Sequence, residues 1–265
     1  MTNVLKLQWK KENNKGISRM KTTGCFKILF LLILKSMLLV AQTEKKIDYQ
    51  DLVWIRYYNQ FTINNKWSLH SEFDNRVFLN PIEQNLYVIR VQGRYKATET
   101  IELGAGFAYF SVNTQDPQIV LGFTVPEYRG QQDLTLKHNY GKIAINHRYQ
   151  IEERFIQNAD KQGLIGGSVF SLRFRYRIQG DYTVWKKENG YLKAILSDEI
   201  LINAGNKTIK NTFDQNRIYI GLQLGISSSL ATEIGYLNSF QQRASGVDYF
   251  DRNIIRISIY HKLKI

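Results

Sequence analysis

Side chains alternate between apolar and polar along most of the chain after residue 50, and this period of two constrains the fold most strongly. The clearest example is the segment 167–179. Its apolar positions are Phe170, Leu172, Phe174, Tyr176 and Ile178, and its polar positions are Ser171, Arg173, Arg175, Arg177 and Gln179. A helix with 3.6 residues per turn would scatter the two sets around its axis, whereas a strand places them on opposite faces. The pattern therefore predicts β-strands.

Ten further segments have the same alternation, three of them clearly and seven more weakly. The clear ones are 143–154, 217–226 and 255–265, and the weaker ones are 51–63, 67–78, 86–96, 101–112, 128–138, 191–203 and 230–243. Short turns and longer loops alternate between these segments, and the longest loops are 113–127, 155–166 and 204–214. Short turns at one rim and long loops at the other are typical of outer-membrane barrels.

The number of strands raises a question of parity. If the short turns face the periplasm, the first of eleven strands starts on the outer side, which an even-stranded barrel forbids. We therefore expect about twelve strands, with residues 43–50 as the source of an additional one, and we allow ten. The predicted fold class is an all-β, closed antiparallel up-and-down transmembrane β-barrel.

The N-terminal region has the composition of a targeting segment. Residues 20–41 consist of a basic start, an apolar run at 28–34 and a small residue, Ala41, as in a signal peptide. Residues 28–40 contain Lys35 and are shorter than the roughly 20 apolar residues that a membrane anchor needs. We therefore expect residues 1–19 to be an upstream extension that is disordered or not translated, 20–41 a signal peptide, and 42–265 the barrel.

The charge and cysteine content exclude several classes of function. The net charge is +13, but the first 41 residues carry eight basic side chains and one acidic, which leaves +6 for the rest. No Lys/Arg-rich run occurs after residue 41, so we expect no nucleic-acid partner. The only cysteine is Cys25, which excludes disulfides and cysteine-based metal or catalytic sites in the expected mature chain.

The polar faces favour a membrane barrel over a soluble β-sandwich. They are dominated by arginine and glutamate, whereas the apolar faces carry aromatic residues near the segment ends. A closed barrel also removes the exposed edges that such long strands would otherwise have. We expect the bacterial outer membrane as the location. The expected partners are outer-membrane lipid, the barrel-assembly machinery during insertion and, as candidates, small anionic solutes.

Several stretches resemble a known family. They are 147–155, 172–177, 198–199, 215–217 and 233–236. In pattern and order these stretches are similar to the uncharacterised bacterial outer-membrane β-barrel family, domain of unknown function 2490. The resemblance covers about residues 50–265. It implies an outer-membrane barrel and implies no particular activity.

An array of arginine and acidic residues on the polar faces is the main candidate site. We expect it to form a lumen network or a constriction from Arg148, Glu152, Arg154, Arg173, Arg175, Arg177, Glu199, Arg217 and Glu233. One interpretation is a structural barrel or narrow pore in which paired charges fill the interior. The alternative is an anion-selective channel, because rings of Arg or Lys select anions in pores.

A lipid-acting outer-membrane enzyme is the second alternative. The chain has four histidines, His70, His138, His147 and His261, and the sequence places none of them beside a serine in a catalytic pattern. The aspartates at expected loops, which include Asp133, Asp181, Asp214 and Asp251, lack calcium-loop spacing. We therefore expect no catalytic residues, no cofactor and no metal.

Overall fold

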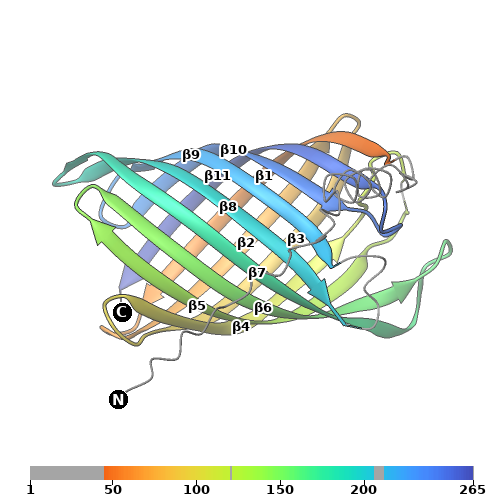
Figure 1. Ribbon diagram of the computed structural model, residues 1–265, viewed down its shortest axis with the longest axis horizontal. Coiled ribbons are helices and arrows are strands. Elements are labelled where there is room, and N and C mark those ends of the chain that lie inside the picture. The colour runs from red at the N-terminus through yellow and green to blue at the C-terminus, as the bar shows by residue number, and fades with distance from the viewer. Residues whose placement is uncertain (1–44, 120, 206–211, 265) are drawn as a thin grey trace, which may run out of the picture. The chain divides into compact units, whose positions relative to one another are not determined.

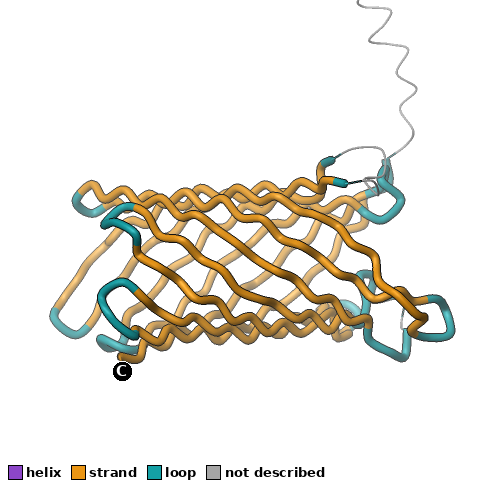
Figure 2. The backbone as a smooth tube through the Cα atoms, turned by 90° about the horizontal axis from the view of Figure 1, so that it is seen from below, coloured by secondary structure: helices purple, strands orange, loops and turns teal. Residues whose placement is uncertain are grey.

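The computed structural model describes residues 45–119, 121–205 and 212–264, and these form one closed β-barrel of eleven strands (Figures 1 and 2). The expected upstream extension and signal peptide lie outside the described residues. The strands are β1 (Ile47–Thr62), β2 (Trp67–Leu79), β3 (Ile82–Lys96), β4 (Ile101–Val112), β5 (Val125–Tyr140), β6 (Ile143–Ala159), β7 (Leu164–Lys187), β8 (Gly190–Ala204), β9 (Phe213–Gly225), β10 (Leu230–Gln242) and β11 (Tyr249–Lys264). Neighbours in sequence pair antiparallel, which confirms the closed up-and-down all-β barrel.

The barrel closes through a parallel pair, and this explains the strand count. β1 pairs with β11 in parallel from Ile47↔Tyr249 to Thr62↔Lys264. The count is therefore eleven, one fewer than the twelve expected, and residues 47–50 lengthen β1 instead of adding a strand. A parallel ladder occupies the edge N–H and C=O groups as an antiparallel one does, so closure does not require an even number.

The two faces of each strand have the expected environments. On β7, Phe170 and Phe174 are 54% and 38% exposed on the outer wall, whereas Arg173 between them is 5% exposed in the lumen. Phe107 and Ile234 on the outer wall of β4 and β10 are likewise well exposed. None of the described residues forms a helix long and apolar enough to cross a membrane.

The lumen also contains two apolar clusters that the alternation did not predict. One joins Leu52, Trp54, Phe78, Ile195, Tyr219, Leu237 and Ile254, and the other joins Leu86, Val88, Ala108 and Phe110. On β1 and β3 both faces carry apolar side chains, so sequence alternation alone could not separate inner from outer positions there. The interior is therefore part hydrocarbon and part charge.

A glycine on β4 allows close approach of β3. A Cβ on Gly106 would lie 2.1 Å from the carbonyl oxygen of Val91 and 2.6 Å from Cα of Gln92. The space beside it is occupied by backbone of the neighbouring strand, which cannot rotate away as a side chain can.

We predict that Gly106→Ala destabilises the barrel by about 1–3 kcal/mol, because the β3–β4 backbones must separate. Gly93→Ala is the matched control, since a Cβ at Gly93 meets its nearest atom, the oxygen of Ala105, at 3.9 Å. Urea unfolding of both variants in lipid vesicles measures the difference. Equal stability of the two variants would show that the strands have more room than the structure indicates.

Candidate functional site in the barrel lumen

A buried carboxylate, Glu152 on β6, lies at the centre of a charged network. Its side chain is 0% exposed. Arg173 Nε donates to Glu152 Oε2 at 2.8 Å, Arg175 donates to Oε1 at 2.6 Å, and Arg129 lies 3.4 Å from Oε2. Gln131 adds a fourth donor at 3.1 Å. Buried charge is stable only when it is paired in this way.

The network extends from Glu152 through further acidic residues. Glu127 accepts from Arg129 at 2.7 Å and from Arg154 at 2.6 Å, and Arg173 also reaches Asp214 at 3.0 Å. Because Arg175 is shared with Glu199, the network continues to a second centre on β8. Charges of opposite sign thus alternate across five neighbouring strands, β5 to β9.

Glu199 is the second centre of the network. Arg175 donates to both of its carboxylate oxygens at 2.8 Å, Arg148 donates to Oε1 at 2.7 Å, and Arg217 lies 3.6 Å from Oε2. Three guanidinium groups therefore converge on one carboxylate that is 6% exposed. Such crowding leaves little acceptor capacity for a further arginine.

The predicted site residues separate into three groups. The structure places Arg148, Glu152, Arg154, Arg173, Arg175, Glu199 and Arg217 in the network just described. Glu233 lies in a separate cluster, where it accepts from Arg256 at 2.8 Å and from the hydroxyl groups of Tyr219 and Tyr260. Arg177 lines the lumen without joining either cluster.

Some network members were missed because strand ends and aspartates were misjudged. Glu127 was expected in a loop but belongs to β5, which begins at Val125. The aspartates 133, 181, 214 and 251, also expected in loops, lie in β5, β7, β9 and β11. Aspartate is common in turns, yet in an enclosed lumen it pairs with arginine, as Asp133 does with Arg94 at 3.0 Å.

Two cavities lie within the lumen of the described barrel. The larger, of about 460 Å³, lies toward the short-turn ends of the strands, and the smaller, of about 80 Å³, lies toward the loops. Five side chains line both cavities and so form a layer between them: Trp54, Arg76, Arg90, Arg175 and Arg217. Trp54 is central to this layer, because the Arg76 guanidinium stacks on its indole with Cζ 3.6 Å from the ring centroid.

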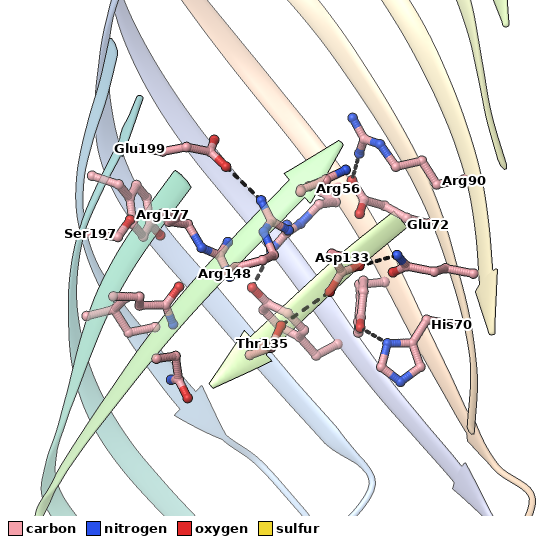
Figure 3. A pocket seen from close by; sticks show the side chains of 18 of the residues that line it. Arg56, His70, Glu72, Arg90, Asp133, Thr135, Arg148, Arg177, Ser197 and Glu199 are labelled. Carbon is pink, nitrogen blue, oxygen red and sulfur yellow. Dashed lines mark hydrogen bonds and ion pairs between the residues drawn. The ribbon is translucent and has the colours of Figure 1, made fainter. Parts of the chain in front are cut away.

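The larger cavity, hereafter the chamber, is polar and positively charged. Ten Arg or Lys side chains and seven Asp or Glu side chains line it, an excess of three positive charges. Figure 3 shows Arg148, Arg177 and Glu199 on one side of this cavity, with Arg56, Glu72 and Arg90 among the other residues that line it. Tyrosine, serine, threonine and amide side chains line the rest, together with His70 and the apolar Trp54, Ile195 and Leu237.

A serine and a histidine that lie close together were not predicted. On β2, Ser68 Oγ lies 3.0 Å from His70 Nε2. The other ring nitrogen, Nδ1, contacts the hydroxyl of Tyr58 rather than a carboxylate. In a Ser-His-Asp triad that position is held by a carboxylate, which stabilises the charged imidazole; here it is held by a hydroxyl group.

Comparison with known proteins identifies a family and two solved structures. The model of a family described as "Protein of unknown function (DUF2490)" matches residues 52–251. Comparison with curated proteins finds no match. Among solved structures, a NanC porin is 13% identical, with 79% of this chain and 97% of that chain covered and a TM-score of 0.47. OmpT, an outer membrane protein of Vibrio cholerae, is 10% identical, with 72% and 81% covered and a TM-score of 0.28.

We predict that Glu152→Gln destabilises the barrel by about 3–5 kcal/mol, because three buried guanidinium groups lose their shared counter-charge. The matched control is Glu153→Gln, one residue along β6, where the side chain lies on the outer wall beside Gly130. That change should leave stability unaltered or slightly raised. Denaturant unfolding followed by tryptophan fluorescence measures both, and a Glu152→Gln variant as stable as the wild type would contradict the central role of this carboxylate.

Proposed function

The chain belongs to the DUF2490 family, whose description assigns no activity, and we therefore propose a function from the geometry of the barrel. We propose that the protein is an outer-membrane β-barrel whose lumen is closed across the middle by paired charged side chains. The proposal makes it a structural barrel or a narrow pore rather than an open porin. It has two parts, residence in the outer membrane and closure of the lumen, and each has its own support.

The outer wall supports residence in a membrane. Its apolar side chains are solvent-accessible in large numbers, among them Phe107 at 77% and Leu196 and Ile220 at 59% each. A soluble protein rarely leaves a continuous apolar surface of this kind uncovered. The strands have 12 to 24 residues, more than the roughly 9–11 that a tilted transmembrane strand needs.

Aromatic side chains on the outer wall support the same interpretation. Toward the short turns lie the pairs Tyr57–His261, Trp67–Tyr95 and Tyr149–Tyr176, and toward the loops lie Tyr109–Tyr128, Phe155–Phe170 and Phe240–Tyr249. Aromatic rings gather at both water–lipid boundaries of membrane barrels. We therefore propose outer-membrane lipid as the surrounding medium and the barrel-assembly machinery as a partner during insertion.

The observation that carries the closed lumen is the layer around Trp54. Its arginines are held in place by the charged network: Arg175 bonds to both Glu152 and Glu199, and Arg76 bonds to Asp74 at 2.7 Å. Side chains fixed by several charge-assisted hydrogen bonds do not move aside readily. A barrel closed by such a layer supports little ionic current.

An anion-selective pore is the second candidate, favoured by the positive excess of the chamber lining. For the lumen we propose no catalytic role, since the Ser68–His70 pair has a hydroxyl, and not a carboxylate, at Nδ1. A lipid-acting enzyme would be revealed by cleavage of labelled phospholipid by the detergent-solubilised protein, and we expect the phospholipid to stay intact.

We predict that the protein fractionates with outer-membrane markers and migrates differently on gels before and after boiling, as closed membrane barrels do. The boiled sample should run at the mass of the unfolded chain and the unboiled sample at a different position. Recovery of the folded chain in the soluble fraction, with no detergent needed, would contradict the membrane assignment.

We predict that wild-type protein gives little or no conductance in planar bilayers, and that Trp54→Ala raises it by joining the two cavities. Trp67→Ala on the outer wall, where the indole is 50% exposed, is the matched control and should conduct as the wild type does. In the Trp54→Ala barrel, the reversal potential in a KCl gradient should favour chloride. High conductance of the wild type would overturn the closed lumen, and preference for potassium would remove the anion-selective candidate.

A further inference from the structure

One arginine of the chamber has no counter-charge. Within the described ranges, the guanidinium group of Arg177 on β7 makes no hydrogen bond or ion pair, and its Nε is buried. A guanidinium carries five N–H donors and cannot lose its charge at any ordinary pH. Leaving such a group without an acceptor is costly, and in this Arg177 differs from Arg148, Arg173 and Arg175, which are paired with carboxylates.

The register explains why no residue of the chain serves Arg177. It lies directly opposite Glu199 on β8, which is the nearest carboxylate in the sheet. That carboxylate already accepts hydrogen bonds from Arg175 and Arg148. Arg177 is therefore excluded from the acidic side chain directly opposite it.

On its other side Arg177 faces a like charge. It is directly opposite Arg148 on β6, and Figure 3 shows the two side chains extending toward one another. Like charges in directly opposite positions of neighbouring strands repel. The Nε of Arg148 is also buried without a partner, so unused donors belong to both arginines.

A second arginine of the chamber lacks a carboxylate partner. Arg56 on β1, across the barrel from β7, bonds only to hydroxyl groups, those of Ser258 and Tyr260. Arg56, Arg148 and Arg177 all line the same chamber of about 460 Å³, which has room for a small molecule. Repulsion, unused donors and space thus occur together at one place.

We propose that the chamber binds an oxyanion, a phosphate or a carboxylate group, between Arg148 and Arg177. The negative charge of such a group removes the repulsion between the two arginines and accepts their unused N–H donors. The planar guanidinium fork matches phosphate and carboxylate oxygens and fits chloride poorly.

The proposal rests on the closed lumen in one respect. The layer around Trp54 ends the chamber on the loop side, so an anion that enters is held rather than passed. Conductance and binding are separate measurements. Absence of binding would refute the oxyanion site but would not contradict the closed barrel. High wild-type conductance would refute closure, and the titration would still decide whether the anion binds.

The test is calorimetric titration of the full-length barrel in detergent with inorganic phosphate and, separately, acetate at constant ionic strength. We expect saturable binding of at least one of the two at about one per barrel. Arg177→Gln should weaken it about tenfold or more, since one charge-assisted contact is lost. Arg177→Lys, which keeps the charge without the fork, should bind with intermediate affinity. The tighter of the two anions identifies the chemistry of the natural group.

Arg252→Gln is the matched control for a lost lumen charge. Arg252 also lacks a carboxylate partner, but it bonds to Gln50 and Gln241 at 2.7 Å and lines the smaller cavity. This variant should bind the anion as the wild type does, and a shift on boiling should show that all variants are folded. Failure of both anions to bind the wild type, or equal binding by wild type and Arg177→Gln, overturns the proposal.

Discussion

The structure depends on one constraint: a guanidinium group enclosed in a barrel needs an acceptor within reach. Arginine cannot be neutralised by losing a proton, so the interior must supply carboxylates. Glu152 and Glu199 meet this need for five arginines of β5 to β9, each carboxylate serving several partners. The result is a cross-linked layer that ties five strands together through their side chains as well as through their backbones.

Apolar packing shares the interior with these charges. The cluster around Leu52, Trp54 and Phe78 lies next to the charged network, and Arg76 joins the two by stacking on Trp54. The chamber is left unfilled by both, and its lining carries an excess of positive charge.

The sequence predicts the fold well and the site in part. The alternation at 167–179 assigns Arg173 to the interior and Phe174 to the exterior, and both assignments are confirmed. Alternation fixes a residue's face but not its register, so it cannot reveal that Arg148 is opposite Arg177 or that Glu199 is crowded by three arginines. Glu127 was missed because it fell within the expected loop 113–127, whereas β5 already begins at Val125. Trp54 lies on a strand with apolar side chains on both faces, where the pattern carries no information.

The parallel pairing of β1 with β11 has a consequence for protein engineering. Both strands run in the same direction along the seam, so β1 begins at the rim where β11 also begins, and β11 ends at the opposite rim. The two ends of the described barrel are therefore separated by the length of a 16-residue strand, about 50 Å. Joining them to make a circular permutant would require a linker long enough to run from one rim to the other. Labels attached to the two ends of the barrel would report from opposite sides of the membrane in which we propose it resides.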